Sequence, residues 1–218
     1  MTSFFAPGPA DGSGARLLER RAQLRRALDD EGRLVDVVTE RDLARPTPCS
    51  GWTLSALLGH LIGQHLGFAQ AVRDGDAPPD AYRPRPAQDH ESILDVTTRW
   101  RDSVAALTDA VAQAAPDRPV TLVEVARDRP LPLEAVLTIQ LVDTAVHTWD
   151  VARTLGRDHM PAADVVAAVL AVARQIPDDD RRGLPGAAFA PARDAAPTPG
   201  GAGPDDWATT LALLGRTP

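Results

Sequence analysis

Apolar residues recur every three to four positions along most of the 218-residue chain, which is the spacing of amphipathic helices. The pattern predicts five longer helices and a short last one, over residues 14–42, 53–73, 91–114, 133–155, 162–176 and 205–214. Residues 120–125 have β character between flanking prolines, and we interpret them as an extended connector. Long helices with long connections are typical of a bundle, so we expect an all-α fold: a four-helix bundle with additional C-terminal helices and a long irregular tail.

Residues with strong local preferences indicate where these helices begin and end. Thr53 follows a stretch rich in proline and glycine and has the side chain of a helix N-cap, and Gly156 stands where a helix would stop. Gly32 lies inside the first helical pattern and is a candidate for a break. Gly63 and Gly67 share one face of the second pattern, where small residues would let another helix or a ligand approach closely.

Changes in composition divide the chain into three parts. We expect a flexible leader at residues 1–12, a helical bundle at 13–176 and a C-terminal extension at 177–218 that is packed on the bundle or tethered to it. Residues 177–204 are rich in Pro, Gly, Ala and Asp. Such a segment is either wrapped over the bundle or mobile.

Composition also excludes several classes of function. The net charge of −7 argues against general nucleic-acid binding, and the apolar runs are too short and too interrupted to span a membrane. The N-terminus lacks a basic region and a proper apolar stretch, so we expect no signal peptide, and the single cysteine suits a reducing cytoplasm. All 23 basic residues are arginine, which excludes a lysine base or Schiff base.

Polar side chains interrupt two of the apolar helical patterns. Asp143 and His147 are four residues apart and therefore share one helix face. His60 interrupts the apolar run of the helix predicted over residues 53–73. If the two helices bring these residues together, two imidazoles and a carboxylate form a three-ligand metal site with open positions. The alternative is a buried network in which His60 pairs with Asp143 and determines the helix register.

Four other polar residues accompany these patterns. Gln64 and Asp150 are candidate catalytic residues that could position a substrate or orient a ligand ring, although Asp150 could equally form a surface ion pair. His65 lies about 140° around the helix from His60, so we expect it on another, partly exposed face. Cys49 precedes a helix N-terminus, which can lower the pKa of a thiol, but we favour a small residue packed in a proline-rich turn.

Two segments resemble the signatures of a known family. Residues 46–53 (PTPCSGWT), followed by 57–61 (LLGHL), are similar to the first signature of the mycothiol-dependent maleylpyruvate isomerase-like proteins, which belong to the DinB-like metal-binding superfamily. Residues 143–153 (DTAVHTWDVAR) with Gly156 are similar to the second signature. The end of the chain, residues 214–218 (LGRTP), is similar to the C-terminus common in an actinobacterial branch of this group.

The resemblance implies a DinB-like bundle that holds a divalent ion on His60, Asp143 and His147. Zn²⁺ is the ion it implies first, with Ni²⁺ or Fe²⁺ as alternatives. Better-studied members often carry glutamate at the position of Asp143, and aspartate has a shorter reach. The implied co-substrate is mycothiol, the low-molecular-weight thiol of actinobacteria. The isomerase also carries a further C-terminal domain, and the tail here is too short for a full copy, so maleylpyruvate is not transferred as the substrate.

Three functions are compatible with these features. The first is a metal-dependent enzyme that activates mycothiol for S-transfer to, or isomerisation of, an electrophilic small molecule. The second is a metal-binding protein without turnover, such as a stress-linked or accessory factor. The third is a helical bundle that presents a groove to a partner protein. The expected partners are therefore a small-molecule thiol and an electrophile, with a homodimer left open.

Overall fold

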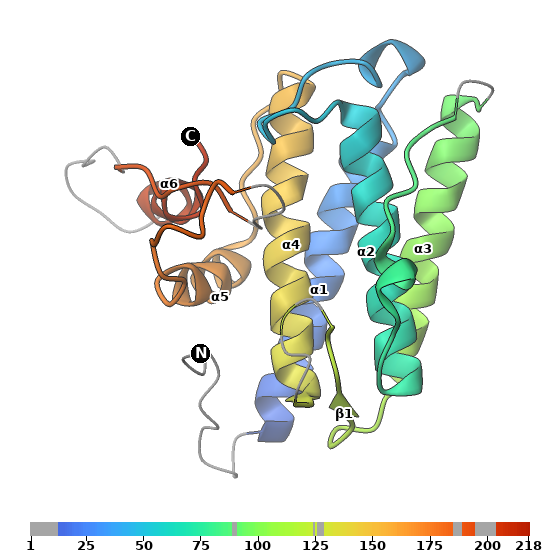
Figure 1. Cartoon of the computed structure of the whole chain (residues 1–218), viewed down its shortest axis with the longest axis vertical. Coiled ribbons are helices and arrows are strands. Elements are labelled where there is room, and N and C mark those ends of the chain that lie inside the picture. The colour runs from blue at the N-terminus through green and yellow to red at the C-terminus, as the bar shows by residue number, and fades with distance from the viewer. Residues whose placement is uncertain (1–12, 89–90, 124, 126–128, 185–188, 195–203) are drawn as a thin grey trace. The chain divides into compact units, whose positions relative to one another are not determined.

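Six α-helices account for most of the structured residues, and the predicted all-α fold is confirmed (Figure 1). The computed structural model describes residues 13–88, 91–123, 125, 129–184, 189–194 and 204–218. In these residues the α-helices are α1 (Ser13–Val35), α2 (Leu54–Asp74), α3 (Ile93–Gln113), α4 (Leu133–Thr154), α5 (Ala163–Ala173) and α6 (Pro204–Leu213). The smaller elements are the 3-10 helices η2 (Glu40–Asp42) and η3 (Pro79–Tyr82) and the antiparallel strands β1 (Pro119–Val120) and β2 (Leu131–Pro132). The leader expected at residues 1–12 lies outside the described residues, as do residues 185–188 and 195–203 of the expected tail.

The four long helices form a bundle within one compact unit, which ends at His159. In that unit α1 packs along α4 and α2 packs along α3, while α2 also contacts α4. Figure 1 shows these four helices running side by side. A second unit begins at Met160 and contains α5 and α6, which pack on each other. The domain boundary expected between residues 176 and 177 stays a prediction.

Capping side chains and glycines set helix limits close to those expected. The Thr53 side chain accepts a hydrogen bond of 3.3 Å from the Ala56 backbone N–H, which makes Thr53 the N-cap of α2. Gly75, with φ 96°, ends α2, and Gly156, with φ 70°, follows α4. Both glycines adopt the left-handed conformation that commonly ends a helix.

Gly32 does not break α1, which continues to Val35. A Cβ atom on Gly32 would lie 3.0 Å from the indole ring of Trp100, which comes from α3. The glycine therefore makes room for a large side chain and does not end the helix.

Three glycines spaced four residues apart, Gly59, Gly63 and Gly67, let residues 82–86 lie directly on α2. A Cβ atom on any of the three would come within 2.2–2.6 Å of an atom of that segment. The Arg85 backbone N–H also donates a 2.8 Å hydrogen bond to the Gly59 carbonyl oxygen. The stripe of small residues therefore receives a connecting segment of the chain, not another helix or a ligand.

Leucines of α2 form the centre of the bundle core. Their side chains are buried together with apolar residues from the other helices and from the segment after α1: Leu54, Leu57, Leu58, Leu61, Val35, Val38, Val96, Trp100 and Val151. Removal of this apolar surface from water is the main stabilising contribution to the bundle. Among the helices that the structure describes, none is both long enough and apolar enough to cross a membrane.

One buried arginine organises the C-terminal unit. The guanidinium group of Arg182 donates hydrogen bonds of 2.6–3.2 Å to four backbone carbonyl oxygens, those of Ile176, Pro177, Ala190 and Leu213. These bonds join the end of the α5 region to the end of α6. Three large apolar side chains in and just after α6 are buried in this unit: Trp207, Leu211 and Leu214.

Candidate metal centre

Helices α2 and α4 bring together the three residues that the sequence singles out. His60 comes from α2, and Asp143 and His147 come from successive turns of α4. Nε2 of His60 lies 3.4 Å, and Nε2 of His147 lies 3.5 Å, from the same oxygen, Oδ1 of Asp143. One potential ligand atom from each residue falls within 4.8 Å of the other two. The three side chains are 13–23% exposed, so the cluster is mostly shielded but reachable.

The spacing of these atoms fits a shared cation. Ligand atoms about 2.0–2.1 Å from a tetrahedral zinc ion lie about 3.3 Å from one another. The two nitrogen–oxygen separations of 3.4 and 3.5 Å agree with this value and are long for hydrogen bonds. The second carboxylate oxygen, Oδ2 of Asp143, is buried without a hydrogen-bond partner. Two imidazoles and an under-compensated carboxylate are therefore a suitable donor set for a divalent ion.

Asp143 carries a negative charge in this environment. Burial opposes the charged form, but the favourable electrostatic interaction with His147 and His60 outweighs it and lowers the pKa of Asp143 to about 2. A carboxylate therefore faces the two histidine nitrogens, and this is the form that coordinates a metal.

Asp150 and Cys49 contact the far side of the His147 ring. Nδ1 of His147 lies 2.9 Å from Oδ2 of Asp150, which is fully buried and not part of a surface ion pair. Because a carboxylate only accepts hydrogen bonds, Nδ1 carries the hydrogen and Nε2 presents its lone pair on the Asp143 side. The Cys49 thiol donates to the same oxygen at 3.1 Å and lies 3.7 Å from Nδ1. Gln64 lies one turn after His60 in α2 and is 8% exposed, and its role stays a prediction.

The turn before α2 places an indole against both histidine rings. The ring centroid of Trp52 is 5.0 Å from that of His60 and 6.3 Å from that of His147, and the second pair is nearly parallel at 18°. The same turn carries Cys49, which packs in it as expected but also contacts polar groups of α4. The segment that forms the first family signature therefore packs on the candidate ligands.

A second group of buried polar side chains connects α1, α2 and α3. His65 is fully buried, so the partly exposed face expected for it is wrong: residues of α1 and α3 cover its ring. Nε2 of His65 lies 3.8 Å from Oε2 of Glu31, which is also fully buried. Nδ1 of His65 pairs with the Ser103 hydroxyl (3.1 Å), and Nε1–H of Trp100 donates to the other oxygen of Glu31.

Burial keeps both members of this pair uncharged near neutral pH. It raises the pKa of Glu31 to about 8 and lowers the pKa of His65 to about 4. Glu31 is not among the residues singled out from the sequence, although its position carries a signal. Glu31 falls three residues after Leu28 and four before Val35, which places a carboxyl group on the apolar stripe of α1.

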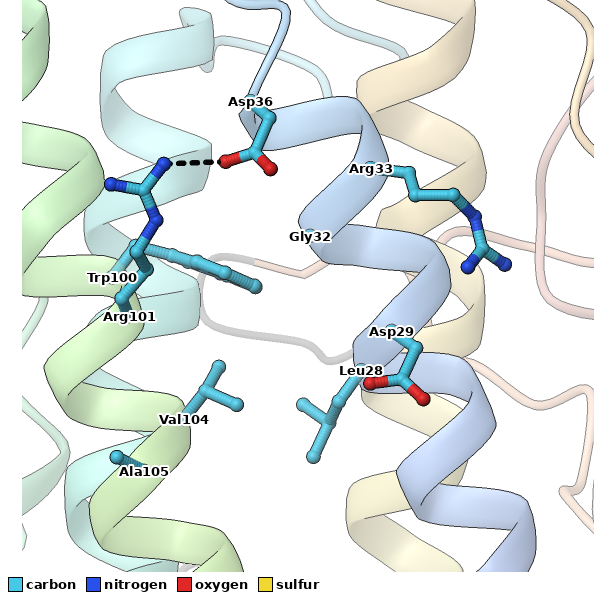
Figure 2. Close-up of a pocket in the computed structure, with 9 residues that line it drawn as sticks. All are labelled: Leu28, Asp29, Gly32, Arg33, Asp36, Trp100, Arg101, Val104 and Ala105. Carbon is cyan, nitrogen blue, oxygen red and sulfur yellow. Dashed lines mark hydrogen bonds and ion pairs between the residues drawn. The ribbon is translucent and has the colours of Figure 1, made fainter.

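An open groove of about 430 Å³ between α1 and α3 is separate from the histidine cluster (Figure 2). Trp100 lines it, and Arg101 and Asp36 form an ion pair of 2.7 Å across it. Its two other charged residues, Asp29 and Arg33, also have opposite signs, and none of the three candidate ligands lines it. The balanced charges give the groove no preference for an acidic or a basic partner.

Comparison with known protein families agrees with this geometry. The family model described as the mycothiol maleylpyruvate isomerase N-terminal domain matches residues 24–152, which is more than half of the chain. The chain belongs to the mycothiol maleylpyruvate isomerase N-terminal domain family. The matched residues include His60, Asp143 and His147, and they run from α1 to the end region of α4. The family resemblance seen in the sequence is confirmed.

Two solved structures have a similar fold: the mycothiol-dependent maleylpyruvate isomerase and a histidine-to-alanine mutant of that enzyme. Their TM-scores are 0.55 and 0.57, and each is 17% identical to this member of the family over 79% of its chain and 72% of theirs. At this identity the likeness shows the fold alone. We found no match among curated proteins.

Proposed function

We propose that the protein binds a divalent ion through His60, Asp143 and His147 and uses it to activate a low-molecular-weight thiol. The activated thiol would take part in S-transfer to, or isomerisation of, an electrophilic small molecule. The observation that carries the proposal is the convergence of three donor atoms from α2 and α4, with both histidine nitrogens at tetrahedral spacing from Oδ1 of Asp143. Zn²⁺ suits two imidazoles and a carboxylate, with Ni²⁺ and Fe²⁺ as the alternatives.

Family membership supports mycothiol as the thiol. The matching family and both similar structures carry mycothiol in their names. The support concerns the class of thiol only, because a likeness of 17% identity does not carry over the electrophile.

The residues of the histidine cluster and its neighbours would have distinct roles in this reaction. A bound Zn²⁺ would supply the positive charge that deprotonates a coordinating thiol. His60, Asp143 and His147 contribute three ligands, which leaves a fourth position for the thiol. Asp150 holds the hydrogen of His147 on Nδ1, so that Nε2 remains the ligand atom. Trp52 packs against the two histidine rings and would shield that side of the site.

Metal analysis tests the first half of the proposal. Protein purified without chelators is expected to contain a tightly held divalent ion, and His60→Ala is expected to lower the metal content by one ion per chain. His159→Ala, which changes a histidine outside the cluster, is the matched control and should leave the content unchanged. Undiminished metal content in the His60→Ala protein would show that the assigned ligands are wrong.

Cobalt-substituted protein tests the second half. Cys49 is the only cysteine, so in a Cys49→Ser chain any thiolate-to-cobalt absorption must come from an added thiol. Mycothiol is expected to produce this absorption and to change the visible cobalt bands. A cobalt spectrum that does not change at saturating mycothiol would contradict thiol activation and favour a metal-binding protein without turnover.

A further inference from the structure

We propose that Cys49, Asp150 and Nδ1 of His147 bind a second divalent cation, so that the His147 imidazole bridges two ions. The inference rests on the proposed function, because the first ion uses Nε2 of the same ring. It concerns a different set of atoms on the opposite side of that ring.

The three donor atoms already form a triangle of nearly the required size. Oδ2 of Asp150 lies 2.9 Å from Nδ1 of His147 and 3.1 Å from Sγ of Cys49, and Sγ lies 3.7 Å from Nδ1. In a tetrahedral zinc site with bonds of about 2.0–2.3 Å, such atoms lie about 3.3–3.6 Å apart. Every observed separation is within about 0.5 Å of that range, so small rotations of the side chains would admit an ion.

The chemistry of the three side chains favours a bound cation over the hydrogen bonds that now connect them. Asp150 is fully buried, and a buried carboxylate is stabilised by a positive charge nearby. Binding a second cation would release to solvent the thiol proton and the Nδ1 proton, both of which Asp150 now accepts, and the ligands would then be a thiolate, an imidazolate bridging the two ions and a carboxylate. A set of one sulfur, one imidazole nitrogen and one carboxylate oxygen selects Zn²⁺ or a similar transition ion over Mg²⁺ or Ca²⁺. Cys49 is only partly buried, which leaves a way in for the ion.

Cobalt titration of the full chain tests the proposal, because the only cysteine is one of the proposed ligands. Chelator-stripped protein is expected to bind two Co²⁺ per chain and to develop thiolate-to-cobalt absorption in the absence of any added thiol. Cys49→Ser is expected to bind one Co²⁺ and to lack this absorption. Ser50→Ala, which changes the exposed neighbouring residue, is the matched control and should behave as the unchanged chain.

The outcomes separate this inference from the proposed function. One Co²⁺ per chain without sulfur absorption would overturn the second site, and loss of that ion in His60→Ala would leave the first site standing. One Co²⁺ with sulfur absorption that survives His60→Ala would overturn both the bridge and the proposed first site. Two ions in the unchanged chain and one in each single variant is the result expected here.

Alkylation of the unchanged chain gives a second measurement that does not depend on how a variant folds. The rate at which a thiol reagent modifies Cys49 is expected to fall at least tenfold only after the second equivalent of Zn²⁺ has been added. A rate that does not change between zero and two equivalents would contradict a bond between Cys49 and the metal.

Discussion

At the scale of single residues, the ring of His147 has polar partners on both of its nitrogens. Nε2 faces Asp143, and Nδ1 pairs with the buried carboxylate of Asp150 at 2.9 Å. A carboxylate in that position sets the tautomer and the rotation of a metal-binding imidazole, and losing it typically weakens metal binding 10–100-fold. Asp150 is therefore a positioning residue for the first ion.

Asp150→Asn should lower the affinity of the first site about 10–100-fold, because the neutral amide holds the Nδ1 hydrogen less firmly. Competition with a chromogenic chelator measures this affinity, and it is best done in a Cys49→Ser background so that only one ion is titrated. Asp158→Asn, at an exposed position, is the control. Equal affinity in the two variants would contradict the positioning role.

The buried pair of Glu31 and His65 makes stability depend on pH in two opposing ways. Burial raises the pKa of Glu31 from 4.5 to about 8, so above pH 4.5 the unfolded chain releases a proton that the folded protein keeps. Burial lowers the pKa of His65 from 6.5 to about 4, so between these values the unfolded chain binds a proton that the folded protein does not. The two effects oppose each other from pH 4.5 to 6.5, and only that of Glu31 remains above pH 6.5.

The unchanged chain should therefore lose stability as the pH rises from 6.5 to 8, and Glu31→Gln should abolish this loss. In the unchanged chain this loss is at most about 1.4 kcal/mol per pH unit for the one proton involved. Urea unfolding of the metal-free protein at several pH values measures it. Asp102→Asn changes an exposed carboxylate on α3 and should keep the slope, and a Glu31→Gln protein with that same slope would contradict a neutral, buried Glu31.

At the scale of elements, α2 combines a ligand, a core face and a glycine stripe in 21 residues. Its leucines bury the core, and Gly59, Gly63 and Gly67 receive residues 82–86. Glycine inside a helix normally lowers stability by about 1 kcal/mol relative to alanine. Here the close approach of the backbone reverses that preference.

Gly63→Ala should destabilise the bundle by about 1–3 kcal/mol, because its new Cβ atom would lie 2.6 Å from the Arg83 carbonyl oxygen. Gly14→Ala is the matched control in α1, where the added atom would meet no other group within 4 Å. That substitution should be neutral or stabilise by up to about 1 kcal/mol. Chemical denaturation compares the two, and a stabilising Gly63→Ala would refute the tight contact.

Most elements were predictable from the sequence because their signals are local. The N-cap at Thr53, the stop at Gly156 and the apolar periods gave the type of the helices and most of their approximate limits. The first helix is the exception, because it ends at Val35 and not at residue 42. Gly32 and His65 were misread because their environment comes from elsewhere in the chain: an indole of α3 covers Gly32, and residues of α1 and α3 cover His65. Helical spacing gives an angle around one helix, but it does not show how many sides of that helix are covered.

The sequence identified the candidate ligands and the two helices that carry them, but not their arrangement in space. Asp143 and His147 had to share a face, and His60 was conspicuous on an apolar run, but their convergence depends on how α2 crosses α4. The contact of Cys49 with Asp150 spans 101 positions along the chain and could not be read from spacing. Whether metal occupies the site stays a prediction.

At the scale of the whole molecule, the chain consists of two units that are stabilised by different interactions. The unit ending at His159 has an apolar core and contains all candidate ligands. The unit that begins at Met160 depends on Arg182, whose guanidinium group satisfies four backbone carbonyls from three separate segments. Buried carbonyls left without a donor are strongly destabilising.

Arg182→Met should destabilise the C-terminal unit by about 3 kcal/mol while leaving metal affinity unchanged, since no ligand belongs to that unit. Hydrogen exchange should accelerate in residues 176–182 and 211–216 and stay slow in α2 and α4. Arg181→Met, an exposed neighbour paired with Asp179, should have little effect on either measurement. Loss of metal binding in Arg182→Met would mean that the two units depend on each other.

The glycine stripe of α2 also limits how that helix can turn about its own axis. A rotation by one residue would bring Leu58 or Leu66 against residues 82–86, where only a hydrogen atom fits. The direction in which His60 leaves the helix is therefore determined by packing on another side of α2. Ion capture would then need side-chain adjustment only, and the cation would meet a site whose backbone is already in its final position.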